Sequence, residues 1–317
     1  MQIDKDTQTL IDERIKNNAP PLESFTPQEL RALRAKMAET PEELKVYISD
    51  VEDFTLKGTL GPITARKYFN KNSNIITHQK SPLIIYFHGG GFVMGDLESH
   101  DLVCRHLCKE AKATIIAVDY KLAPEHKFPA PVIDAKDAIT KIIEKEKEYN
   151  FDANKVILCG DSAGGTLAAV GTIMSRDNTI PKVHGQILVY PWVDMTMCRR
   201  SMDIDLEGMI LNKKTINYFA NHYLNTPREQ VDWRASPILT ADLSNLPPTY
   251  IYGAGLDPLV DEGDAYKRRL LSFGNEVHYR LFPGQMHAFL SNSVQLPTAL
   301  ICIKEMGKAA QTIFSNL

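Results

Sequence analysis

A chain of 317 residues that is 44% hydrophobic is long enough to bury a large core in one α/β domain. Its net charge of −3 gives no electrostatic reason to expect a nucleic acid or an anionic membrane surface as a partner. No apolar run is long enough to span a bilayer, and the polar N-terminus lacks the features of a signal peptide. The five cysteines are odd in number and widely spread, so we expect no disulfide framework and a cytoplasmic location.

Two amphipathic helices are predicted ahead of the first strand. Leu10, Ile11 and Ile15 share one face of the first helix. Residues 26–29 (TPQE) form a capping box with proline at the first position of the second helix. We interpret residues 1–45 as an N-terminal helical cap segment that covers an active site. The alternative is a helical pair packed on the side of the domain.

The rest of the chain, residues 46–317, alternates between extended and helical segments. This alternation predicts an α/β sheet with helices on both faces. The predicted strands are 46–56, 63–69, 82–87, 114–118, 155–159, 183–190, 249–252 and 276–282. The predicted helices are 132–148, 166–174, 262–273 and 298–314.

One segment, residues 194–232, interrupts this alternation. It is rich in methionine, charge and asparagine, and residues 213–223 have a helical pattern. We interpret it as a cap insertion that packs with the N-terminal helices. Four methionines of this part of the chain either line a substrate pocket or form the core of the cap: Met195, Met197, Met202 and Met209.

The segment that organises the predicted chemistry is KVILCGDSAGG, residues 155–165. It places Ser162 in the pattern G-x-S-x-G between a buried strand and a helix, which is the nucleophile elbow of serine hydrolases. The strained turn leaves no room for side chains at the flanking glycines. We therefore predict that Ser162 is a nucleophile. Its base, its acid and its oxyanion donors must then come from other segments of the chain.

The candidate base is His287, which follows the last predicted strand in a loop with proline and glycine. Parallel strands end at the same edge of the sheet, so this loop lies near the serine. The candidate acid is Asp257, which follows the predicted strand 249–252. This gives the chain order Ser, acid, His. We interpret its neighbours Asp261 and Glu262 as charges that complement a helix dipole.

The candidate oxyanion loop is HGGGF, residues 88–92, directly after the strand PLIIYF. Consecutive glycines let backbone N–H groups turn toward a substrate. We predict donors at Gly90, Gly91 and Ala163, with Gly89 shaping the loop of the oxyanion hole. A nucleotide site is the rival interpretation, but the glycine spacing does not match G-x-G-x-x-G and no phosphate-loop lysine is present.

Five motifs together resemble the hormone-sensitive lipase family of α/β-hydrolases. They are HGGGF (88–92), DYKLAPEHKFPAP (119–131), GDSAGG (160–165), DPLVDEG (257–263) and GQMHAF (284–289). Their order and separations are compatible with that family over roughly residues 45–315. The resemblance implies an α/β-hydrolase fold: a mostly parallel eight-stranded sheet flanked by helices, with a helical cap.

The resemblance also implies carboxylester hydrolysis by a triad of Ser162, Asp257 and His287 through an acyl-enzyme intermediate. No metal or organic cofactor is expected. The sequence departs from the family pattern at Thr166 and Lys121, and we expect both to be structural.

Several neighbouring side chains are expected to act as scaffolding. We expect Asp161 to bond to nearby backbone, and the ring of His88 to fix the glycine loop by hydrogen bonding. Tyr120 and Glu125 are expected to support the next loop.

The expected partner is a small-molecule ester with a small or medium acyl group. The alternatives are an amidase or peptidase on the same fold, or a receptor that binds without hydrolysis. A homodimer could form through the edge strand at 276–282. Cys104 and Cys108 are spaced as metal ligands on a helix, but we interpret them as small buried hydrophobes.

Overall fold

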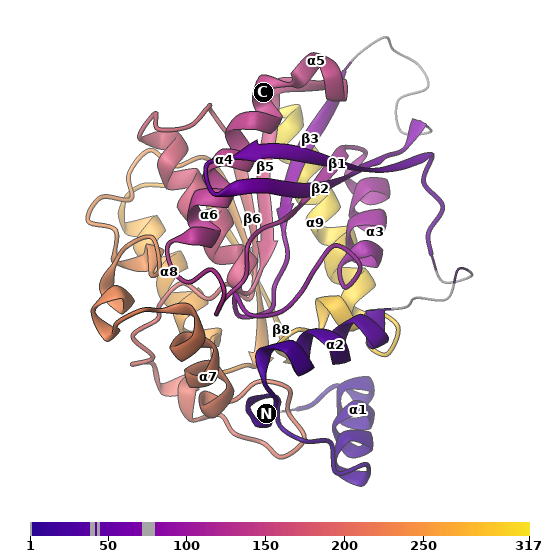
Figure 1. Ribbon diagram of the computed structural model, residues 1–317, viewed down its shortest axis with the longest axis vertical. Helices are drawn as coiled ribbons and strands as arrows, with labels where there is room; N and C mark the ends of the chain where they lie inside the picture. Colours follow the sequence, from indigo (N-terminus) through magenta and orange to yellow (C-terminus); the bar gives the residue numbers. More distant parts are fainter. Residues whose placement is uncertain (1, 39–41, 43–44, 72–79) are drawn as a thin grey trace.

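One eight-stranded sheet forms the centre of the molecule (Figure 1). The computed structural model describes residues 1–317 except 1, 39–41, 43–44 and 72–79. The strand order is β1-β2-β4-β3-β5-β6-β7-β8, with β1 and β2 antiparallel and β3 to β8 mutually parallel. This confirms the predicted mostly parallel sheet. The strands are β1 (Asp50–Gly58), β2 (Gly61–Phe69), β3 (Ser81–Phe87), β4 (Thr114–Asp119), β5 (Phe151–Asp161), β6 (Gly185–Val189), β7 (Thr249–Leu256) and β8 (Val277–Met286).

The central strands are almost continuously apolar because helices cover both faces of the sheet. Every residue of β6 is buried, and so is all of β3 except Pro82. Two helices pack on one face, and three longer helices with one short helix pack on the other. The first set is α3 (Asp101–Ala111) and α9 (Thr298–Ser315), and the second is α4 (Ala130–Glu144), α5 (Glu146–Tyr149), α6 (Ala163–Arg176) and α8 (Val260–Ser272).

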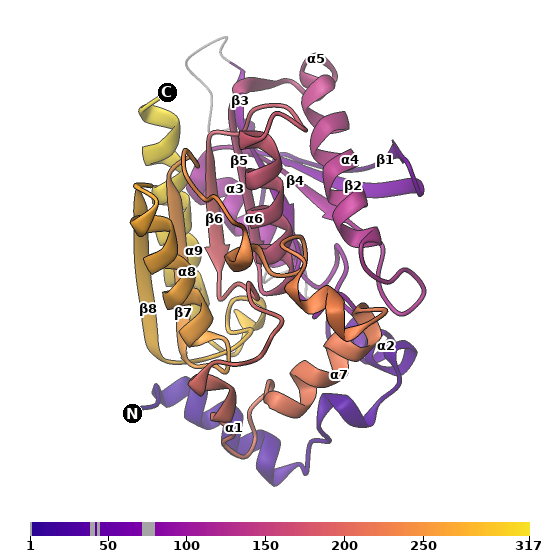
Figure 2. The ribbon, with the colours of Figure 1, turned by 90° about the vertical axis from the view of Figure 1, so that its left-hand side faces the viewer.

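The remaining helices gather at the end of the molecule toward which the parallel strands point (Figures 1 and 2). The hydroxyl of Tyr218 donates to the carbonyl of Phe25 at 2.9 Å, and the hydroxyl of Thr215 donates to Glu23 at 2.6 Å. These bonds join segments almost two hundred residues apart in the sequence. The N-terminal elements are α1 (Lys5–Lys16), η1 (Leu22–Ser24) and α2 (Pro27–Ala38), and their partner is α7 (Lys213–Tyr223).

The capping box predicted for α2 is confirmed. The N–H of Thr26 donates to the carboxylate of Glu29 at 2.8 Å, and the N–H of Glu29 donates to the hydroxyl of Thr26 at 3.3 Å. Short 3₁₀ helices complete the chain: η4 (Arg200–Asp203), η5 (Pro227–Val231), η6 (Pro237–Leu239) and η7 (Leu290–Asn292).

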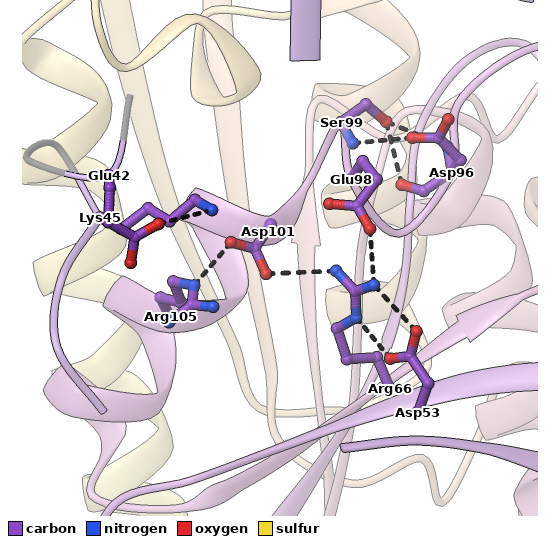
Figure 3. Close-up of polar contacts among 9 residues, drawn as sticks. All are labelled: Glu42, Lys45, Asp53, Arg66, Asp96, Glu98, Ser99, Asp101 and Arg105. Carbon is purple, nitrogen blue, oxygen red and sulfur yellow. Dashed lines mark hydrogen bonds and ion pairs between the residues drawn. The ribbon is translucent and has the colours of Figure 1, made fainter. Parts of the chain in front are cut away.

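An ionic network ties the antiparallel edge of the sheet to the start of α3 (Figure 3). Arg66 on β2 contacts Asp53 at 2.6 Å, Glu98 at 2.6 Å and Asp101 at 3.4 Å. Asp101 also accepts a hydrogen bond from Arg105 at 2.6 Å. The segment that leads from the glycine loop into α3 is therefore fixed to the sheet by charge pairs at its far end.

The opposite edge of the sheet is β8. A homodimer through this edge stays a prediction. Within the described part of the chain, no helix combines the length and hydropathy needed to cross a membrane.

Candidate active site

Ser162 sits at the sharp turn between β5 and α6. Its backbone has φ +54° and ψ −119°, a region that non-glycine residues rarely adopt. The N–H of Ser162 donates to the carbonyl of Val189 at 2.9 Å, which anchors the turn to β6. A Cβ at Gly164 would lie 2.0 Å from the carbonyl oxygen of Phe87. The turn therefore requires a glycine there, as the sequence predicts.

Three of the predicted residues meet in one chain of hydrogen bonds. Nε2 of His287 lies 2.9 Å from the hydroxyl oxygen of Ser162, and Nδ1 lies 2.7 Å from Oδ2 of Asp257. The second carboxylate oxygen of Asp257 accepts the N–H of Leu259 at 2.8 Å. All three side chains are buried, and Asp257 is completely so. In this arrangement Asp257 can orient the imidazole and His287 can accept the proton of Ser162.

The neighbouring acids of Asp257 behave differently from each other. Asp261 lies in the first turn of α8 and accepts the N–H of Ser201 at 2.9 Å, away from the imidazole. Glu262 lies in the same first turn, as expected, but its side chain is completely buried. Its Oε1 accepts the N–H groups of Val193 at 2.6 Å and Asp194 at 3.2 Å.

Burial and the carboxylate of Asp194 raise the pKa of Glu262 well above its usual value. The protonated form of Glu262 is therefore favoured in the folded protein. A signal for its burial exists in the sequence, because Glu262, Tyr266 and Leu270 recur every four residues on the inward face of α8.

Three residues of the glycine loop (88–92), Gly89, Gly90 and Gly91, line the same cavity as Ser162. Gly90 and Gly91 have φ values of +124° and +62°, which glycine adopts without strain. The N–H of Gly89 donates to Oδ1 of Asp161 at 3.0 Å, so this group is committed to the scaffold. In the described chain, the N–H groups of Gly90, Gly91 and Ala163 have no hydrogen-bond acceptor. These three groups are free to serve as donors to a ligand.

Asp161 bonds to neighbouring backbone as expected, and its partner is the glycine loop, which is distant in sequence. Its Oδ1 also accepts the hydroxyl of Tyr86 at 2.7 Å and lies 3.3 Å from Nε2 of His100. Burial alone would raise the pKa of Asp161, but His100 and the Tyr86 hydroxyl hold it below its usual value. Sequence reasoning missed His100, because nothing in its local context distinguishes it from the other histidines.

His88 supports the glycine loop as predicted. Its Nδ1 lies 2.8 Å from the carbonyl of Gly89, and its ring stacks on Tyr120 with centroids 4.3 Å apart. The hydroxyl of Tyr120 donates to the carbonyl of His88 at 2.6 Å. Burial and the nearby His100 lower the pKa of His88 to about 4, so its ring is neutral at pH 7.

The other scaffolding residues also make structural contacts. Glu125 pairs with Arg31 of α2 at 2.7 Å. Lys121 binds the buried carboxylate of Asp134, and the hydroxyl of Thr166 donates to the carbonyl of Trp192. The two departures from the family pattern are therefore structural, as expected.

Cys104 and Cys108 are buried thiols. Burial raises the pKa of both, to about 12 for Cys108, so neither is a thiolate at neutral pH. This agrees with their interpretation as small hydrophobes. Within the described residues, no cluster of three or more His, Cys, Asp or Glu side chains has the arrangement of a metal site.

A cavity of about 380 Å³ opens onto Ser162 and His287. Its walls come from α1, η1, α2 and α7, together with the glycine loop and the segment after His287. The apolar lining includes Leu10, Leu22, Phe25, Leu30, Leu33, Ile210, Leu211, Ile216 and Phe219.

The methionines left open by the sequence belong to the core and not to the cavity lining. Met195, Met202 and Met209 are buried, and Met197 packs against the core. None of them lines the cavity.

Comparison with known proteins identifies a family and several named relatives. The family model described as alpha/beta hydrolase fold matches residues 84–291. The carboxylic ester hydrolase LipN of Mycobacterium tuberculosis is 38% identical over 248 residues, which are 76% of this chain and 65% of LipN. The esterase LipI of the same organism is 34% identical over 85% of this chain and 84% of LipI.

A solved structure also superposes on almost the whole chain. It is an ester-hydrolase from the metagenome of Lake Arreo, complexed with a derivative of bipyridine phosphonate. The TM-score is 0.92 at 32% identity, and the match covers 99% of this chain and 100% of the other.

Proposed function

Because this chain belongs to the alpha/beta hydrolase fold family, in its hormone-sensitive lipase branch, we propose that it cleaves small to medium acyl esters by serine catalysis. Its enzyme class is carboxylic ester hydrolase, the class of its named relatives. The observation that carries the proposal is the hydrogen-bonded chain from Ser162 through His287 to Asp257 at the cavity wall.

In the proposed mechanism, His287 accepts the proton of Ser162 as the serine oxygen attacks the ester carbonyl carbon. Asp257 holds Nδ1–H of the imidazole and stabilises the imidazolium that forms. The tetrahedral intermediate collapses, His287 protonates the departing alcohol, and an acyl-enzyme remains. A water molecule deprotonated by His287 then attacks the acyl carbon and releases the acid.

The N–H groups of Gly90, Gly91 and Ala163 are the proposed donors to the oxyanion. Their support is that all three have positions beside Ser162 and no acceptor among the described residues. Donors of this kind act most strongly where the developing charge is shielded from water. Gly89 is assigned to the hole as the residue that holds the loop, since its N–H binds Asp161.

We propose that residues 1–45 and the insertion at 194–232 act together as a cap over the catalytic domain. Hydrogen bonds join α7 to the segment before α2, and both line the cavity with apolar side chains. Such a cap decides which acyl and alcohol groups reach Ser162. Residues 1, 39–41 and 43–44 of the cap segment lie outside the described residues.

The proposal is tested with p-nitrophenyl acetate and butyrate and the variant Ser162→Ala. The variant should lose the activity while its thermal unfolding stays close to that of the wild type. Equal hydrolysis by the two proteins would overturn the proposal. A series of esters from acetate to palmitate tests the chain length, with the highest kcat/KM expected for the short and medium acyl groups.

A further inference from the structure

Arg34 of α2 lines the cavity and has no partner among the described residues. Burial lowers the pKa of its guanidinium, and the carboxylates that influence it from a distance are Asp161 and Asp96. Neither carboxylate makes a hydrogen bond to it in the described structure: Asp161 accepts the N–H of Gly89, and Asp96 accepts the N–H of Ser99. Arg34 therefore remains a charged group with unused donors in a largely apolar wall.

Two nearby arginines show the contrast. Arg31, one turn earlier on α2, pairs with Glu125 through both terminal nitrogens and also donates to backbone carbonyls. Arg14 of α1 lines the cavity too, but its Nε donates to the carbonyl of Gly208 at 2.9 Å. Arg34 is the one of these three whose guanidinium is wholly uncommitted in the described structure.

The charges around the cavity are unbalanced. Among its described lining residues, Arg14 and Arg34 are the cations and Asp161 is the carboxylate. Asp161 already has Tyr86 and Gly89 as donors, so its charge is stabilised by the scaffold. A partly dehydrated cation without a partner is costly, and a ligand that brings an anion removes that cost.

We propose that the cavity takes esters that carry a carboxylate, such as half-esters of dicarboxylic acids, and that Arg34 binds this carboxylate. A planar guanidinium fits a carboxylate through two parallel hydrogen bonds. The apolar walls hold the methylene chain between the carboxylate and the ester, and the ester carbonyl lies at Ser162. This inference rests on the proposed function, since it names the substrate of the same site.

The test compares each half-ester with a neutral ester in which a methyl group replaces the carboxylate. Monoethyl succinate, adipate and suberate are paired with ethyl butyrate, hexanoate and octanoate, and acid release is followed by titration at constant pH. For the best half-ester, Arg34→Gln should lower kcat/KM about 10- to 100-fold, mainly through KM. For the matching neutral ester, the same variant should change kcat/KM less than about threefold. Arg34→Lys should give an intermediate loss, because it keeps the charge without the fork.

The control is Lys36→Gln, which removes a positive charge from the exposed side of the same helix. It should leave kcat/KM unchanged for both substrates. If Arg34→Gln lowers kcat/KM equally for the half-ester and the neutral ester, or for neither of them, Arg34 is structural and the inference is wrong. If Arg14→Gln rather than Arg34→Gln lowers kcat/KM for the half-ester, the assignment to Arg34 is wrong. If the wild type cleaves neither class, or Ser162→Ala cleaves as well as the wild type, the proposed function itself fails.

Discussion

The carboxylate of Asp161 accepts the backbone N–H of Gly89 at 3.0 Å, so the residue before the proposed nucleophile Ser162 fixes the glycine loop. Removing this acceptor with Asp161→Ala should let the glycine loop move and misplace the donors at Gly90 and Gly91. Loss of one well-placed donor lowers kcat about 100- to 1,000-fold, and we expect a fall at the lower end of that range. Steady-state kinetics with p-nitrophenyl butyrate measure it, and KM should change little.

A conservative variant separates positioning from stability. Asp161→Asn keeps an oxygen that can accept the N–H of Gly89, so kcat should recover most of the way toward the wild type. If Asp161→Ala lowers the melting temperature but leaves kcat unchanged, Asp161 has no part in positioning the loop.

Much of the sheet could be predicted because burial on both faces leaves an apolar run in the sequence, as in β3 and β6. The boundaries were less accurate. The predicted helix 132–148 is two helices, α4 and α5, that meet at Lys145. The strand β5 begins at Phe151, four residues before the predicted start at Lys155, because Phe151 pairs with Ser81 of β3. Such pairing leaves no trace in local hydrophobicity.

The hydrogen-bonded chain of Ser162, His287 and Asp257 could be predicted because each residue follows a strand at the same edge of the sheet. The contact between Asp161 and Gly89 could not, because it depends on register: Phe87 of β3 pairs with Gly160 of β5, which brings the ends of the two strands side by side. Arg34 was also missed. Its helix was predicted, but only the tertiary position of α2 brings this side chain to the cavity.

The two aspartates of DPLVDEG give a direct test of the proposed acid. Asp257 bonds to Nδ1 of His287, whereas Asp261 bonds to the N–H of Ser201. Asp257→Asn should lower kcat by orders of magnitude, about ten-thousand-fold in the best-studied triad, because the imidazole loses its orienting acceptor. Asp261→Asn should leave kcat within about threefold. The opposite pattern in steady-state kinetics would reassign the acid.

Two glycines in helices should respond in opposite ways to alanine. A Cβ at Gly164 would lie 2.0 Å from the carbonyl oxygen of Phe87, so Gly164→Ala must push the start of α6 away from β3. We expect a loss of about 1–3 kcal/mol in the free energy of unfolding, with reduced kcat. At Gly263 of α8 no atom lies within 4 Å of a new Cβ. Gly263→Ala should add about 0.5–1 kcal/mol through helix propensity.

Urea unfolding of the two alanine variants measures both changes. If Gly164→Ala is as stable and active as the wild type, the packing of the elbow against Phe87 is not a constraint. If Gly263→Ala is destabilised, the space around that position is filled in solution.

The raised pKa of Glu262 predicts a stability that falls as pH rises. In the folded protein its pKa is raised well above the usual value, so the side chain holds its proton to higher pH than in the unfolded chain, which loses the proton above about pH 4.5. Unfolding is therefore favoured progressively above that pH, by about 1.4 kcal/mol for each pH unit up to the folded pKa.

Glutamine has the shape of the protonated acid and no proton to lose. Glu262→Gln should therefore match the wild type near pH 4.5 and melt about 2 °C or more above it at pH 8. Calorimetry at the two pH values measures this, with the exposed Glu144→Gln as the control that should show no such divergence. If Glu262→Gln instead melts further below the wild type at pH 8 than at pH 4.5, the ionised carboxylate stabilises the fold and the prediction is wrong.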